Sequence, residues 1–188
     1  MPPSDRVQQR VLRSLDGITG ETVGFSCGAV DRSVPTMGQI EQAFKELPFA
    51  MPSVHVQPEG NETLVNLPTY YEVRWPSSGL SAGDVSAPVQ LLSWSVRFKI
   101  AAHSHTYRFG DGQSSGPTTD VGGPYPRREI THMYAHKGTV KVKVDAVLTG
   151  QVSINGGPWE PLAATAELPD EPVTVLAVKE VRNHLIPD

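Results

Sequence analysis

A possible nucleophile lies near the start of the 188-residue chain, where Gly24-Phe25-Ser26-Cys27-Gly28 matches the G-x-S-x-G elbow. In that motif Ser26 would be the nucleophile of an acyl-transfer reaction. The elbow requires several preceding strands that present the serine at the top of a sheet, and the residues before Gly24 predict only a helix and a linker. We therefore interpret the match as a chance loop sequence and keep a hydrolase as a distant alternative. Cys27, the single cysteine, has no neighbouring Lys, His or second Cys to lower its pKa and is interpreted as an incidental thiol.

Histidines and aspartates give two further patterns with possible chemistry. Histidines two positions apart on a strand share a face, a spacing compatible with zinc. The histidines in question are His103, His105, His132 and His136. Asp111 and Asp120 could bind calcium together with loop carbonyls. Zinc normally takes four placed ligands and calcium six or more oxygens, so we predict no metal site and no cofactor.

Composition narrows the class of protein. The net charge of -4 and the pI near 5.8 argue against nucleic acid as a partner, because such binding relies on clustered Lys and Arg. No window approaches the roughly 18 apolar residues that span a bilayer, so no membrane span is expected. Met1 is followed by Pro, Ser, Asp and Arg rather than an apolar signal core, so no signal peptide is expected in this chain.

Two helices are expected before the strands begin. Ser4 is a candidate N-cap for an amphipathic helix over residues 4–16, which could support self-assembly, and the Gly- and Ser-rich stretch from Gly17 to Pro35 is typical of a linker. Thr36 and Gln39 have the spacing of a capping box and predict a second helix, with Pro52 beyond its end. Its buried face would carry Ile40, Phe44 and Leu47.

Beyond residue 53 the sequence consists of short runs rich in Val, Thr, Tyr and Trp between Gly, Pro, Asn and Asp clusters. We predict strands at 54–57, 62–66, 70–75, 88–101, 105–109, 128–134, 138–149, 151–154, 159–166 and 172–181. The last run is apolar on both faces and is expected in a protected position, and Trp94 is expected in the core. Asn155-Gly156-Gly157 predicts a tight hairpin turn. Many short strands favour an all-β sandwich or barrel.

Three segments then occur in a recognisable order: Tyr107-Arg108-Phe109-Gly110-Asp111-Gly112, then Thr131-His132-Met133-Tyr134, then Gly138 opening an alternating strand. This order resembles the signature of PKD domains. The resemblance implies an Ig-like β-sandwich of two antiparallel sheets with a short N-terminal helical extension. The residues from Leu47 to Tyr71 are similar to the lead-in of PKD-like exported proteins of actinobacteria, which implies an extracellular or cell-surface location.

The motif residues have structural explanations. Gly110 and Gly112 tolerate positive φ, and Asp111 between them can accept backbone amides and hold the turn. Phe109 shares a face with Tyr107 and would enter the core, and the polar tips of His132 and Tyr134 would each need a partner when buried. We expect these residues, with Gly138, to be a structural motif and predict no catalytic residue.

Function is expected in the loop from Gln113 to Arg128, because loops carry function on such scaffolds. Tyr125, Arg127 and Arg128 are the candidate binding residues, and the expected partner is a protein or carbohydrate surface. We divide the chain into residues 1–35 (helix and linker), 36–53 (short helix and Pro-rich lead-in) and 54–188 (PKD-like sandwich). The leading hypothesis is a noncatalytic interaction, adhesion or spacer module. The alternative is a structural subunit of a cell-envelope or phage-particle assembly, with a virion location.

Overall fold

The computed structural model describes residues 34–127, 129–168 and 171–181, and the structural statements below concern these residues. This part of the chain is mostly β structure, with one short helix and two sheets. The amphipathic helix expected at 4–16, the linker, Ser26 and Cys27 lie outside the described residues, as does Arg128.

The helix is α1, Met37–Lys45, and the predicted capping box is confirmed. The Thr36 hydroxyl accepts from the Gln39 backbone amide, and the Gln39 side chain accepts from the Thr36 amide, which satisfies two otherwise unpaired donors. Ile40 and Phe44 are buried as expected, together with Ala43. Among the described residues no helix is long and apolar enough to cross a membrane.

The first sheet contains β1 (Ser53–Gln57), β3 (Thr69–Arg74) and β7 (Thr131–His132) in the order β1-β3-β7, and all its pairings are antiparallel. In β1 and β3 alternate residues are buried, so each strand turns one face toward the second sheet and one toward solvent.

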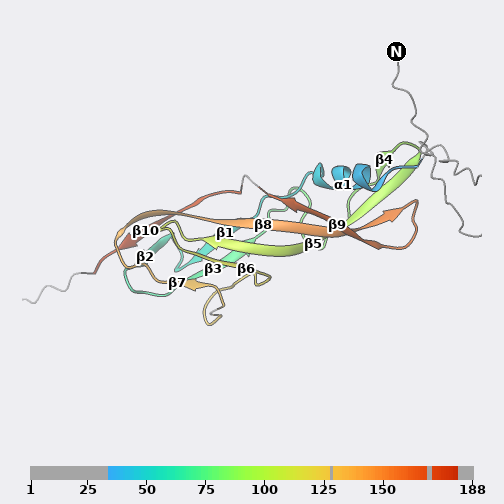
Figure 1. The fold of residues 1–188 in the computed structure, drawn as a ribbon. Coiled ribbons are helices and arrows are strands. Elements are labelled where there is room, and N and C mark those ends of the chain that lie inside the picture. The colour runs from blue at the N-terminus through green and yellow to red at the C-terminus, as the bar shows by residue number, and fades with distance from the viewer. Residues whose placement is uncertain (1–33, 128, 169–170, 182–188) are drawn as a thin grey trace, which may run out of the picture. The chain divides into compact units, whose positions relative to one another are not determined.

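The second sheet is larger and strongly curled (Figure 1). Its main path is β2 (Glu62–Leu64), β10 (Thr174–Lys179), β8 (Gly138–Ile154), β5 (Trp94–Arg108) and β4 (Val89–Leu91). In addition, β6 (Ser114–Thr118) pairs with β5, and β9 (Glu160–Glu167) pairs with β8. The expectation of two antiparallel sheets is wrong here, because β2 and β10 pair in parallel and make this sheet mixed. No tight turn connects these distant segments, so hairpin geometry does not dictate their direction.

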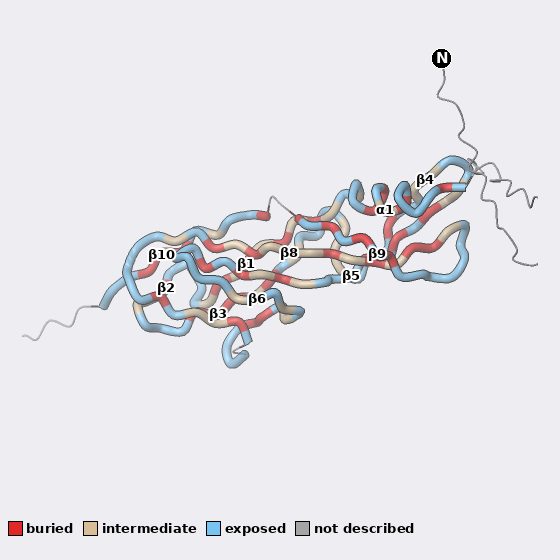
Figure 2. The backbone as a smooth tube through the Cα atoms, viewed as in Figure 1, coloured by how far each residue is buried: buried red, intermediate tan, exposed pale blue. Residues whose placement is uncertain are grey.

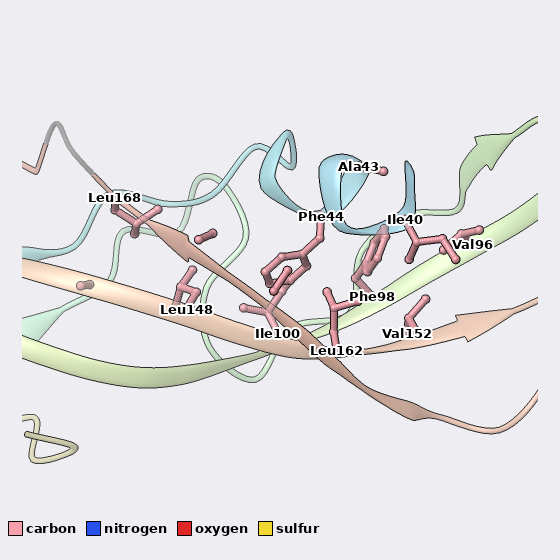
Figure 3. Close-up of a cluster of buried hydrophobic side chains, with 13 residues drawn as sticks. Ile40, Ala43, Phe44, Val96, Phe98, Ile100, Leu148, Val152, Leu162 and Leu168 are labelled. Atoms are coloured by element: carbon pink, nitrogen blue, oxygen red, sulfur yellow. The ribbon is translucent and has the colours of Figure 1, made fainter. Parts of the chain in front are cut away.

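Two buried clusters lie along the β5–β8 ladder, visible as two groups of buried backbone in Figure 2. In the first, α1 packs on the half of the ladder that contains Trp94 and Ile154, and the Phe44 ring points from the helix toward the sheet (Figure 3), with its centroid 5.6 Å from that of Phe98. The second lies between the first sheet and the other half of the ladder and contains Tyr71, Tyr107 and Phe109. Both clusters therefore depend on the same two long strands.

Two predicted strand breaks are wrong, and each has a local reason. The break expected after residue 101 is a register shift between Ala102 and Ser104, so the strand continues and only the pairing is irregular. The break expected at Gly150 is absent, and β8 continues through this residue. A Cβ at Gly150 would lie 2.7 Å from the Lys99 carbonyl oxygen and 3.0 Å from the Phe44 ring, so this glycine provides room for the helix instead of ending the strand.

Two predictions of burial are also wrong. The run at 172–181 is not protected on both faces, because Val173, Val175 and Val181 are exposed. β10 does lie between two strands, but nothing among the described residues covers its outer face at these positions. Trp94 is half-buried rather than in the core, because Leu92 and Ser93 form a turn that separates β4 from β5 inside the strand expected at 88–101.

Candidate functional site

The corner after β5 is built around Asp111. One carboxylate oxygen accepts the backbone amide of Gln113 at 3.0 Å, and the other lies 2.7 Å from Nε2 of His132. Gly110 and Gly112 have φ of 82° and 93°, values that side chains rarely adopt. The predicted role of Asp111, a carboxylate that holds the turn through a backbone amide, is therefore seen directly, and its second contact, with His132, was not predicted.

Aromatic rings complete this corner. The His132 ring stacks on Phe109 with centroids 4.2 Å apart and planes 1° apart, and Tyr134 meets His132 edge-on at 4.7 Å. The Tyr134 hydroxyl donates to the Phe109 carbonyl at 2.9 Å and lies 2.8 Å from the Tyr71 hydroxyl. His132 and Tyr134 thus each have the partner that a buried polar tip requires.

Ionisation at the corner follows from these contacts. Burial alone would raise the pKa of Asp111, but the hydrogen bonds from His132 and the Gln113 amide outweigh burial and hold it below its usual value. Burial raises the pKa of Tyr134 to about 12 and that of Tyr71 further, so both phenols stay protonated at neutral pH. The corner is therefore a set of mutually satisfied groups, an arrangement that stabilises a turn.

The loop from Gln113 to Arg128 is attached to both sheets. Its first part forms β6, which the sequence did not predict, because Ser-Ser-Gly-Pro-Thr lacks the alternation of a half-buried strand. Further along, the Asp120 carbonyl accepts from the Tyr107 hydroxyl at 3.0 Å. Val121 and Gly123 then exchange backbone hydrogen bonds with β3. Part of this loop projects away from the strands (Figure 1).

Tyr125 lies in the turn at residues 124–127, called the tip below, and is 63% exposed. Its backbone amide donates to the Gln57 side chain at 2.8 Å, and its ring meets Tyr70 edge-on at 5.8 Å, with 76° between the planes. The Arg127 amide donates to the Pro124 carbonyl at 3.0 Å, and its side chain occupies the space where a Cβ on Gly123 would lie. Tyr125 and Arg127 are thus exposed at their tips and held at their bases.

A groove of about 440 Å³ lies beside the tip and the corner. Its lining combines apolar and polar side chains: Pro68, Tyr70, Gln113, Thr131, His132 and Met133. Because Tyr70 contacts Tyr125 and His132 contacts Asp111, the groove connects the exposed tip to the rigid corner. Tyr125, Arg127 and these lining residues are referred to below as the tip surface. The sequence did not indicate the groove, because its lining residues come from separate segments of the chain.

The candidate metal ligands are not brought together. The expectation that His103 and His105 share a face is wrong: the register shift beside His103 leaves it exposed, whereas His105 is buried. Asp111 is engaged with His132, and a carboxylate oxygen of Asp120 accepts the Gly122 amide at 2.7 Å. Among the described residues no group of three or more His, Cys, Asp or Glu side chains could hold a metal ion.

His105 has an unusual environment that the sequence did not indicate. It is 1% exposed, lies near Trp75, and neither of its ring nitrogens has a hydrogen-bond partner within the described structure. Burial lowers the pKa of His105, so the ring is neutral at neutral pH. A buried neutral imidazole without hydrogen bonds is a weak point in the fold, because polar groups normally lose stability when they are buried unpaired.

Comparison of the chain with protein-family models and with curated proteins found no match.

Proposed function

We propose that this chain is a noncatalytic interaction module of the PKD type, which binds a partner protein outside the cell or at the cell surface through the tip surface. The observation that carries the proposal is the combination of an exposed Tyr125 with a base fixed by Gln57, Tyr70 and the backbone of β3. A rigid, exposed aromatic side chain is typical of interface anchors, since it buries a large area at a small cost in conformational entropy.

The PKD assignment is supported by the chemistry of the corner. The motif residues Phe109, Asp111, His132 and Tyr134 contact one another through ring stacking and hydrogen bonds. These contacts join two of the three motif segments, 107–112 and 131–134, in one corner. They also favour a structural role over catalysis, because these side chains satisfy each other and not a substrate.

A protein partner is favoured over a carbohydrate by the angle between the two tyrosine rings. A sugar that stacks on two aromatic rings needs faces that are roughly coplanar, and the planes of Tyr70 and Tyr125 are 76° apart. An edge-on pair with an arginine at its margin and a groove of mixed polarity beside it instead suits an irregular surface of side chains. Arg127 would lie at the margin of such an interface, and arginine is enriched at protein interfaces.

The first experiment replaces residue 125 with the photoreactive amino acid benzoylphenylalanine in the full chain, produced in its own host. Irradiation is expected to give one discrete adduct, identified by mass spectrometry. The same replacement at Val175, an exposed position on β10, is the matched control and is expected to give no such adduct. Equal labelling at the two positions, or none at 125, would contradict the proposal, and an adduct with a second copy of the chain would favour the structural-subunit alternative.

The second experiment measures affinity for the purified partner. Tyr125→Ala is expected to weaken binding at least about tenfold, whereas Arg127→Ala is expected to act mainly on the association rate and its salt dependence. A glycan array probed with the wild-type chain and Tyr125→Ala tests the other class of ligand, carbohydrates. Glycan binding that depends on Tyr125 would mean that the partner is a carbohydrate and not a protein.

A further inference from the structure

Two turns lie together at the end of the second sheet that is far from the corner. One is Leu92-Ser93 between β4 and β5, and the other runs from Asn155 to Trp159 between β8 and β9. The turns are joined by two hydrogen bonds: the Ser95 amide donates to the Asn155 side chain at 2.9 Å, and the Asn155 amide donates to the Ser95 carbonyl at 2.7 Å. These residues, Leu92–Ser95 and Asn155–Trp159, are called the distal end below.

The distal end belongs to two segments of the chain that have no charged side chains. Residues 85–96 and 146–159 contain no Asp, Glu, Lys, Arg or His, although 19% of the whole chain is charged. These two segments are adjacent in space, because Val96 pairs with Ile154 in the β5–β8 ladder. Leu92 is 54% exposed and Trp159 is 38% exposed, so large apolar side chains of these two segments meet solvent.

Leu92 also has an unfavourable backbone conformation. Its φ is 55°, and the three other non-glycine residues with positive φ in the described structure are all asparagines, which tolerate this region. In a two-residue hairpin turn, the first position with positive φ favours Gly, Asn or Asp. The chain therefore places a bulky apolar side chain at an exposed turn at some cost in stability, and strain of this kind is concentrated at functional sites.

We propose that the distal end inserts into the interfacial region of a lipid bilayer that contains anionic lipids. The inserted side chains would be Leu92 and Trp159, with Trp94 behind them. Tryptophan suits this boundary because its ring is apolar and its N–H can face water, and it is enriched at membrane interfaces. A projecting turn needs no complementary groove in a fluid bilayer.

The charges behind the turn support a lipid surface. The first charged residues of β5 are Arg97 and Lys99, both exposed. At a rise of about 3.4 Å per residue they lie roughly 10 and 17 Å behind Trp94. Interfacial segments bury apolar side chains about 5–10 Å deep, so Arg97 would reach the phosphates when the turn is inserted. Glu160, exposed next to Trp159, would oppose binding to anionic lipid.

A second copy of the chain is a poorer occupant than a bilayer. A stable protein interface buries about 800 Å² on each partner, which two partly exposed side chains at narrow turns do not supply. Insertion into lipid has no such requirement, because its free energy increases with each apolar group removed from water.

The test is flotation of the full chain with vesicles of phosphatidylcholine, with and without phosphatidylglycerol. Wild type is expected to float with both, more strongly with the anionic vesicles. Leu92→Asn is expected to reduce binding at least about tenfold, because one large apolar side chain no longer enters the bilayer. Asparagine suits the positive φ of this position, so the thermal midpoint should be unchanged or higher, which excludes misfolding as the cause.

Two further variants and one control refine the result. Lys99→Gln is expected to weaken binding only to the anionic vesicles. Glu160→Gln is expected to strengthen binding to the same vesicles. Val175→Thr changes a side chain that is equally exposed, at 54%, but lies on β10, and should bind like wild type. Absence of wild-type binding, or full binding by Leu92→Asn, would overturn the proposal. Self-association of the chain without lipid, if Leu92→Asn abolishes it, would also overturn the proposal. The distal end would then bind a second copy of the chain.

Discussion

Asp111 and His132 are 21 positions apart in the sequence, and the Asp111 carboxylate accepts a hydrogen bond from Nε2 of His132 at 2.7 Å. An ionised carboxylate is only an acceptor, so the contact places the proton of the imidazole on Nε2. The remaining carboxylate oxygen holds the Gln113 amide. One side chain thereby connects the turn after β5 to the short strand β7.

Asp111→Ala should therefore destabilise the fold. Loss of hydrogen bonds to a charged group is expected to cost about 1.5–3 kcal/mol of unfolding free energy, measured by urea denaturation at pH 7. Because the folded-state pKa of Asp111 is lowered, its contribution is present above the unfolded-state pKa of about 3.9 and is lost as the pH falls through the folded-state value. The difference in unfolding free energy between wild type and Asp111→Asn should accordingly shrink below pH 4. Glu129→Gln, an exposed change three residues from His132, should stay within about 0.5 kcal/mol of wild type at both pH values.

The two glycines that flank Asp111 form a matched pair. A Cβ at Gly110 would lie 2.4 Å from the carbonyl oxygen of Lys141, whereas a Cβ at Gly112 would meet nothing within 4 Å. Both have positive φ, so Gly112→Ala is expected to cost about 1–2 kcal/mol from backbone strain alone. Gly110→Ala should cost clearly more, because strand β8 must move. Equal losses of unfolding free energy in the two variants, measured by urea denaturation, would show that the close approach of β8 to Gly110 adds no further cost.

His105 should make the protein sensitive to mild acid. The unfolded chain binds a proton near pH 6.5 and the folded chain only at lower pH, so the unfolding free energy should fall as the pH decreases below about 6.5. His105→Leu should remove this slope between pH 7.5 and 5 in urea denaturation. His103→Leu, two residues away and exposed, is the control and should retain the slope. If both variants behave alike, burial of His105 does not determine the acid response.

Phe44 tests whether α1 is part of the same cooperative unit as the sheets. Its ring is fully buried against Phe49 and Phe98, so Phe44→Ala is expected to lower the unfolding free energy by about 3–5 kcal/mol. Met37→Ala, on the exposed side of the same helix, should change it by less than about 0.5 kcal/mol. Circular dichroism and tryptophan fluorescence should show coincident transitions, and a separate early transition in Phe44→Ala would mean that the helix detaches alone.

Local signals were sufficient for much of the fold. The Thr36–Gln39 capping box, the Asn155-Gly156 turn and the alternation around Val142 depend on residues that are neighbours in sequence, and all three are confirmed. The corner was predicted in part for the same reason, because Gly110, Asp111 and Gly112 form one turn. Contacts between segments that are far apart in the sequence were harder to infer.

The errors occur where distant segments decide the outcome. Gly150 would normally end a strand, but here it leaves space for Phe44, more than 100 positions earlier. One irregular position leaves His103 exposed while His105 is buried, whereas a regular strand would place both on one face, since strand faces alternate with a period of two. The groove beside Tyr70 combines residues from three separate segments, so no spacing along the chain could have indicated it.

β5 pairs with β8 from Val96–Ile154 to Arg108–Lys143, with one register shift between Ala102 and Ser104, and this long ladder has a mechanical consequence. Antiparallel hydrogen bonds run across the strands, so tension applied along them between a bilayer at one end and a bound protein at the other loads many bonds simultaneously. The module would then resist shear as a single tether, and force would be transmitted through its length before either core opened.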